Sequence, residues 1–123
     1  GAINARTGEL LALAISESNA CDYCLDAHNF IGEKLLKIDA AVLEAARKGE
    51  SNDPKTQAIL QFAKTLVSKN GLVNNEDVNA AKNAGLSDAE ISETVAYVAL
   101  NVLTNYFNNT ANTEIDFPVA VKA

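Results

Sequence analysis

The sequence of 123 residues lacks methionine and tryptophan, and it has only two prolines and six glycines. So few helix-breaking residues argue against a low-complexity or disordered chain. Lysine and arginine total 10 against 16 acidic residues, a formal net charge of −6, and the basic residues form no cluster. A positive footprint for nucleic acid or for an anionic membrane surface is therefore missing. We expect neither as a partner.

Long apolar runs are also scarce. The longest uncharged apolar stretch, 94–107, is interrupted by Asn101, Thr104 and Asn105, and is too polar and too short to span a membrane. No basic segment followed by an apolar run and a cleavage site opens the chain, so we expect a cytoplasmic protein. Because the chain begins at Gly1 without any methionine, we expect it to be processed, tagged or truncated at its N-terminus.

About half of the residues are apolar, and they recur at helical rather than strand spacing. This pattern predicts one all-α domain of about six helices over residues 1–123. Thr7 and Asp53 are the expected N-caps of the first and fourth helices, and Ser87 with Glu90 forms a capping box for the sixth. The expected helices cover 7–19, 21–37, 40–48, 53–71, a fifth helix that opens at Asn74 or Asn75 and closes at Gly85, and the segment after 87.

The expected last helix is apolar on two faces. In so small a domain this predicts packing against another subunit as well as against the helix's own core. The alternative is that one chain covers both faces. For the polar stripe along this helix, hydrogen bonds across a subunit interface and a solvated face are equally good interpretations; the stripe comprises Asn101, Asn105, Asn108 and Asn112.

Both cysteines and the only histidine lie in one short segment, Cys21-Asp22-Tyr23-Cys24-Leu25-Asp26-Ala27-His28. On a helix, Cys21 and Cys24 share a face, and a disulfide can close between them. Cys21 would lie at the helix N-terminus, where free N–H groups favour a thiolate. His28 comes four residues after Cys24, so its imidazole can reach that sulfur and accept a thiol proton. The segment predicts a redox dithiol.

Glu9 is the fourth candidate residue. If the first two helices form an antiparallel hairpin, Glu9 can reach His28 and fix its tautomer. A second interpretation makes Glu9 an ordinary acidic residue of a first helical turn. The cysteines could also be small buried hydrophobes, or all four side chains could bind zinc. Gly32, one turn beyond His28, indicates close packing or substrate access, or else a tolerated surface glycine.

The spacing Glu9-x11-Cys21-x2-Cys24-x3-His28 in a helical chain resembles the alkylhydroperoxidase AhpD family, within the carboxymuconolactone decarboxylase-like superfamily. The resemblance covers roughly 4–118, and segment 101–118 is similar to the peroxidase-related branch. It implies an AhpD-like helical bundle that assembles into trimers or hexamers. It also implies a thiol-dependent hydroperoxide reductase for antioxidant defence, with no cofactor and no metal.

The resemblance further implies a role for each residue. Glu9 and His28 form a proton relay to Cys24, which attacks the peroxide and becomes a sulfenic acid. Cys21 then closes the disulfide, and a lipoyl-type or other dithiol carrier restores the thiols. The helix dipole favours Cys21 as the more acidic thiol and the histidine favours Cys24; we take Cys24 as the peroxidatic residue.

One departure from the family lies between the two cysteines. Well-studied AhpD proteins carry a second histidine there, and this chain has Tyr23, which cannot act as a base near neutral pH. We therefore expect weaker activity or a different reductant. The alternative function is a non-catalytic oligomeric redox sensor or a zinc-binding scaffold.

Overall fold

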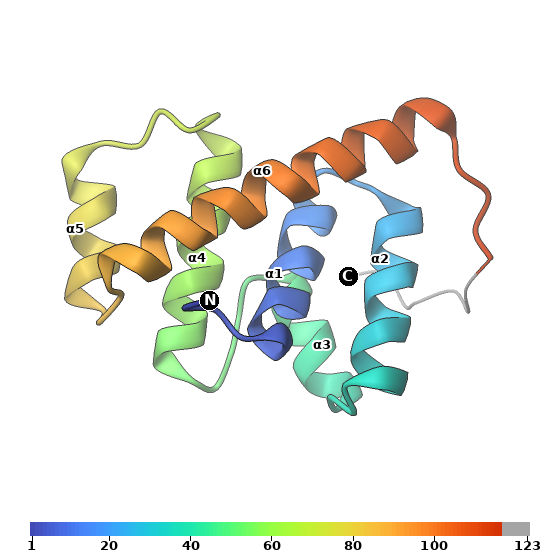
Figure 1. The fold of residues 1–123 in the computed structure, drawn as a ribbon, viewed down its shortest axis with the longest axis horizontal. Coiled ribbons are helices and arrows are strands. Elements are labelled where there is room, and N and C mark those ends of the chain that lie inside the picture. Colours follow the sequence, from blue (N-terminus) through green and yellow to red (C-terminus); the bar gives the residue numbers. More distant parts are fainter. Residues whose placement is uncertain (117–123) are drawn as a thin grey trace.

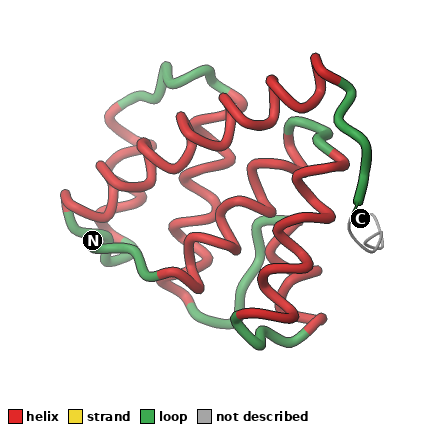
Figure 2. The backbone as a smooth tube through the Cα atoms, turned by 45° about the vertical axis from the view of Figure 1, so that its right-hand side comes forward, coloured by secondary structure: helices red, strands yellow, loops and turns green. Residues whose placement is uncertain are grey.

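The structure, a computed structural model, describes residues 1–116, and helices joined by short connections make up this part of the chain (Figure 1). No strand occurs within the described range, as the tube in Figure 2 shows. A π-helical turn, η1 (Ile31–Leu35), follows the second α-helix directly. The expected all-α class is confirmed, and the α-helices are α1 (Ala5–Ser18), α2 (Asp22–Phe30), α3 (Ala40–Arg47), α4 (Pro54–Ser68), α5 (Asn75–Asn83) and α6 (Asp88–Ala111).

Helix α1 is the central element of the bundle. It contacts α2, α3, α4 and α6, and Figure 1 shows it between α4 on one side and α2 with α3 on the other. Every residue from Leu10 to Ser16 is buried. These side chains pack in one core with large apolar residues of the neighbouring helices, among them Leu25, Leu43 and Leu60. Since each such side chain contributes about 1.5–3 kcal/mol on burial, α1 is a firm support for the residues it carries.

Most helices begin where local capping signals predict. The Asp53 carboxylate accepts a hydrogen bond from the Thr56 N–H at 2.9 Å, and Pro54 opens α4. Reciprocal capping boxes begin α5 at the N-cap Asn74 and α6 at the N-cap Ser87. These three predicted starts are confirmed, because each depends only on residues within one turn.

Two expected boundaries are wrong. Asn4, rather than Thr7, caps α1: its side chain accepts a hydrogen bond from the Thr7 N–H at 2.8 Å. The second expected helix is α-helical only as far as Phe30, and η1 replaces its last part. Gly32 lies in that π-helical turn, where an added Cβ would come within 2.7 Å of Leu43 Cδ2 on α3. The close-packing interpretation of Gly32 is therefore confirmed.

Helix α6 lies across the outside of the bundle, against α1, α2 and α4 (Figure 1). One of its apolar faces is uncovered: Leu100, Leu103, Tyr106 and Phe107 are 57–68% exposed. Within residues 1–116 nothing covers this face, and whether a second subunit covers it stays a prediction. None of the helices in the described range is both long and apolar enough to cross a membrane.

Candidate redox site

The two cysteines lie at the start of α2. Cys21 is the N-cap residue, and its Sγ accepts a hydrogen bond from the Cys24 N–H at 3.3 Å. The two Cα atoms are 5.2 Å apart, and a disulfide joins the two sulfurs. Cys21 is fully buried and Cys24 is 3% exposed. The predicted pairing across one helical turn is therefore present, and the protein shields both cysteines almost completely from water.

Glu9 on α1 and His28 on α2 meet as the sequence predicts. His28 Nδ1 lies 2.7 Å from Glu9 Oε2, and the two side chains are 25% and 19% exposed. With Nδ1–H donating to the carboxylate, Nε2 is the ring nitrogen that can accept a further proton. The expected contact exists because α1 and α2 pack against each other after a tight turn. The role of this pair as a relay stays a prediction.

Helix α6 supplies neighbours of the disulfide that were not predicted from the sequence. The Thr104 carbonyl oxygen lies 3.9 Å from Cys24 Sγ, and Asn108 Nδ2 lies 3.8 Å from the same sulfur. The Asn108 amide is itself held, since its Nδ2 donates to Thr104 O at 2.9 Å and its Oδ1 accepts from the Thr113 hydroxyl at 2.7 Å. The polar stripe on α6 was the only available signal for these contacts.

The stripe forms hydrogen bonds within this chain. Asn105 is fully buried, donates to Ser16 Oγ at 3.0 Å and accepts from Asn19 Nδ2 at 3.0 Å. Asn101 donates to the Tyr97 carbonyl of its own helix at 2.8 Å. Neither predicted interpretation, an intersubunit bond or a solvated face, describes Asn105. Its two bonds instead connect α6 to the end of α1, just before the cysteines.

A hollow of about 270 Å³ opens beside the Glu9–His28 pair. Its polar lining comes from these two side chains and Asn101, while Gly8, two alanines, Leu100 and Tyr97 provide the rest. The Tyr97 ring lies close to α1, because a Cβ on Gly8 would be 2.8 Å from Tyr97 Oη. A small molecule in this hollow would contact the imidazole directly.

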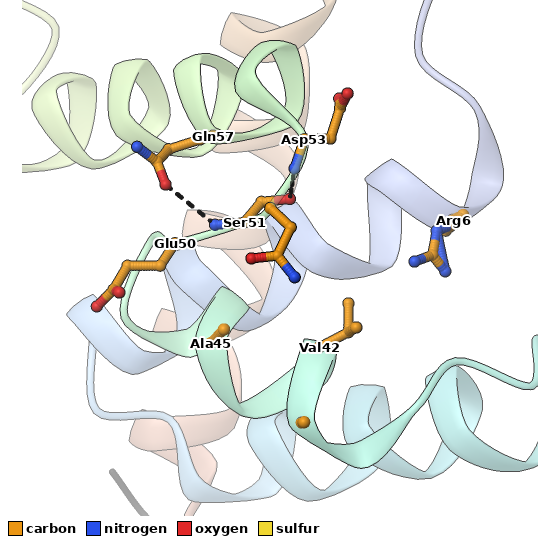
Figure 3. Close-up of a pocket in the computed structure, with 9 residues that line it drawn as sticks. Arg6, Val42, Ala45, Glu50, Ser51, Asp53 and Gln57 are labelled. Carbon is orange, nitrogen blue, oxygen red and sulfur yellow. Dashed lines mark hydrogen bonds between the residues drawn. The ribbon is translucent and has the colours of Figure 1, made fainter.

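A larger hollow of about 560 Å³ lies elsewhere, between α1, α3 and the segment that leads into α4 (Figure 3). Figure 3 shows Arg6 of α1 on one side and Glu50 on the other, with the Ser51 N–H donating to Gln57 at 3.2 Å. Neither a cysteine nor a histidine is among the residues that line this hollow. We therefore place the candidate site at the disulfide and the Glu9–His28 pair.

The ligand set of the zinc hypothesis is not assembled within residues 1–116. No group of three or more histidine, cysteine, aspartate or glutamate side chains in that range is arranged to hold a metal ion. Both sulfurs are joined in the disulfide, so neither is present as the thiolate that binds zinc. The zinc-binding scaffold therefore has no support in this arrangement.

No family model matches the chain, and no curated protein does. Solved structures do match. The chain is similar to an alkylhydroperoxidase AhpD core, an uncharacterized peroxidase-related protein from Ralstonia eutropha JMP134, with a TM-score of 0.79 and 25% identity. It is also similar to an uncharacterized peroxidase-related protein from Silicibacter sp. TM1040, with a TM-score of 0.80 and 18% identity. Each match covers 98% of this chain and 62% of the other.

This chain therefore spans about three fifths of the length of these relatives. Its fold is AhpD-like, as the resemblance in the sequence implied. The last two residues of that resemblance, Phe117 and Pro118, lie outside the described residues.

Proposed function

We propose that this chain, an AhpD-like bundle with a CxxC pair, is a thiol-dependent hydroperoxide reductase. One observation carries the proposal: a disulfide caps the same short helix that presents His28, and the His28 ring is bound to Glu9 from the central helix. A reversible dithiol needs a nearby base whose tautomer is fixed, and His28, bound to Glu9, is the residue we assign to that role. The names of the two matched structures, which refer to peroxidases, support the same class of reaction.

The proposed cycle starts from the reduced pair. His28 Nε2 accepts the proton of the Cys24 thiol, and the thiolate attacks one oxygen of the hydroperoxide. An S–O bond forms, the O–O bond breaks, and the departing oxygen takes a proton to leave as an alcohol or water. The Cys21 sulfur then attacks the sulfenic acid on Cys24, forming the S–S bond and releasing water. Two electrons have passed from the dithiol to the peroxide.

We assign the attack on peroxide to Cys24. Cys24 is the less enclosed of the two residues, since it is 3% exposed and Cys21 is fully buried. Cys24 also has His28 one helical turn ahead on α2. Because Tyr23 occupies the position of the family's second histidine, we expect slower turnover or a different reductant. We propose a lipoyl-type or other dithiol carrier as the electron donor.

The test is turnover of hydrogen peroxide and of an organic hydroperoxide with dihydrolipoamide as the donor. We expect Cys24→Ser to abolish peroxide consumption, because the attacking sulfur is gone. Cys21→Ser should consume about one equivalent of peroxide and stop at a sulfenic acid or a mixed disulfide, detectable by mass spectrometry. Full turnover by Cys24→Ser would refute the proposal.

The same assay tests the second candidate function, an oligomeric redox sensor. A sensor would close the Cys21–Cys24 disulfide stoichiometrically with peroxide but would not turn over with any dithiol donor. The near-complete burial of the disulfide is the observation that favours this candidate, because access limits the rate at which a dithiol can reduce it.

A further inference from the structure

We propose that Asn108 is a further residue of the redox site. Its side-chain amide donates a hydrogen bond to Cys24 and stabilises the Cys24 sulfur as a thiolate. The inference rests on the proposed redox role of the pair and adds a residue from α6, more than eighty positions away in sequence. Its geometric basis is the distance of 3.8 Å between Asn108 Nδ2 and Cys24 Sγ, which suits an N–H···S hydrogen bond.

The surrounding groups decide which end of the Asn108 amide faces the sulfur. Asn108 Nδ2 lies 2.9 Å from the Thr104 carbonyl oxygen, which can only accept, so the NH₂ end must be there. The Oδ1 end accepts from the Thr113 hydroxyl at 2.7 Å. An amide has two N–H donors on its nitrogen. One has the Thr104 carbonyl as its acceptor, and the other is available to Cys24 Sγ.

Thr104 and Asn108 together offer a partner to each protonation state of Cys24. A thiol can donate its proton to the Thr104 carbonyl oxygen, 3.9 Å from Sγ. After ionisation the sulfur needs donors instead, and the Asn108 amide provides one. Because Cys24 is only 3% exposed, water contributes little to solvating that charge, and a fixed donor matters more than it would at the surface.

The chain immediately after α6 keeps the amide in place. Asn112 adopts a left-handed conformation at φ 52°, which turns the backbone back on the helix end. The Thr113 N–H then donates to the Asn108 carbonyl at 3.2 Å, while its hydroxyl holds the Asn108 side chain. Thr113 is thus a positioning residue that acts on Cys24 through Asn108.

The effect of the Asn108 amide on Cys24 can be measured separately from the effect of charged side chains. Helix α6 carries no charged side chain between 94 and 111, so its contribution to the sulfur is that of neutral groups. The acidic side chains and the histidine of α1 and α2 stay unchanged in every variant below; they are Glu9, Glu17, Asp22, Asp26 and His28. A change in the titration of Cys24 then reports the amide.

The experiment measures the pH dependence of iodoacetamide alkylation in a Cys21→Ser background, in which Cys24 is the sole thiol. We expect Asn108→Leu to move the alkylation midpoint upward by about one pH unit, since a donor to a charged acceptor is lost. Asn108→Asp has the shape of asparagine but replaces the donor by a carboxylate, so its upward shift should exceed that of leucine. A loss of packing alone would give the reverse order.

Two further variants complete the test. Thr113→Val should give a smaller upward shift, because the amide stays but loses its support. Asn109→Leu is the matched control: the Asn109 amide donates to the Asn19 carbonyl at 3.0 Å, and we expect its midpoint to equal that of the Cys21→Ser parent. The inference is overturned if both Asn108 variants titrate like Asn109→Leu, or if Thr113→Val shifts the midpoint as far as Asn108→Leu.

Alkylation uses no peroxide and no donor, so this outcome is independent of the proposed function. A failure of wild-type turnover alongside shifted midpoints would remove the peroxidase and keep the amide contact. Unshifted midpoints alongside full turnover would remove the amide contact and keep the peroxidase. Circular dichroism of each variant shows whether a shift comes from an intact helical fold.

Discussion

Glu9 is held where α1 comes to the surface. Between Gly8 and Ser16 it is the one residue that is not buried, and its neighbours Gly8 and Leu10 are both enclosed. The backbone on either side is thus fixed by core packing, while the carboxylate emerges toward α2. A charged group carried on so rigid a segment loses little backbone entropy when it binds His28. The 2.7 Å contact between them is consistent with this support.

The relay proposal predicts the effect of changing His28. In the reduced protein, His28→Gln should shift the alkylation profile of the thiols to higher pH and lower kcat/KM for peroxide by about 10²-fold, the low end for loss of a general base. Glu9→Gln should have a smaller effect of the same sign, because the imidazole remains. Stopped-flow peroxide consumption across pH 5–9 is the measurement.

Glu33→Gln is the control for this series, since Glu33 is an exposed carboxylate on η1 whose ion pair with Lys34 is solvated. We expect its profile to match the wild type. A wild-type profile in His28→Gln would show that the imidazole is not the base.

The site was only half predictable from the sequence. Cys21, Cys24 and His28 lie within one helix, and Glu9 lies on the adjacent one, so helical geometry and one hairpin suffice to bring them together. Asn108 and Thr113 reach the disulfide because α6 crosses α2 at a particular register. That register depends on the buried Asn105 bond to Ser16 and on core packing, which no local pattern encodes.

At the scale of helices, two carboxylates at helix starts have lowered pKa values. The Lys69 ammonium donates to Asp77 at the start of α5 and lowers its pKa below the ordinary 3.8, and a backbone N–H lowers it further. Lys55 does the same to Glu90 at the start of α6, whose ordinary pKa is 4.5, again aided by a backbone N–H. Both groups are thus better bound as anions in the folded state.

The consequence for stability has a definite sign. A pKa lower in the folded than in the unfolded state stabilises the protein above the unfolded pKa, and this contribution disappears as pH falls through the folded pKa. We therefore expect the free energy of unfolding, from urea titrations, to fall progressively once pH drops below about 4.5, and further below 3.8. Glu90→Gln should flatten part of this decline. A free energy of unfolding that stays constant from pH 5 to 3 in the wild type would contradict the prediction.

The helices themselves show which boundaries a sequence can predict. The starts of α4, α5 and α6 depend on one side chain and the N–H groups of the next turn, and they were predicted. Asn4 and Thr7 are both capping types, and the choice between them follows from packing. The π-helical turn was not foreseen, and it contains Gly32, which packs closely against Leu43 of a different helix.

At the scale of the molecule, the uncovered face of α6 predicts self-association. Leu103 and Phe107, at 65% and 68% exposed, lie one turn apart beside further exposed apolar residues of the same helix. Exposed apolar patches often mark sites of contact between proteins. An apolar face can pack against another copy of the same face. We therefore expect a second copy of this chain to cover it, within the trimer or hexamer that the family resemblance implies.

Leu103→Glu combined with Phe107→Glu should reduce the molar mass measured by light scattering to that of one chain, while helical content stays unchanged. Leu72→Glu is the control, because Leu72 is 83% exposed but lies outside α6, in the connection after α4. A wild-type protein that is monomeric at all concentrations would refute the prediction.

The enclosure of the sulfurs limits how electrons can return to them. Reduction requires a thiolate to approach one sulfur along the S–S axis. Cys21 is fully buried, and Cys24 is 3% exposed with Asn108 of α6 against its sulfur, so little of either residue is presented at the protein surface. We therefore expect a carrier that extends a single narrow chain to reduce the pair faster than a globular one, with access as well as driving force deciding which reductant is used.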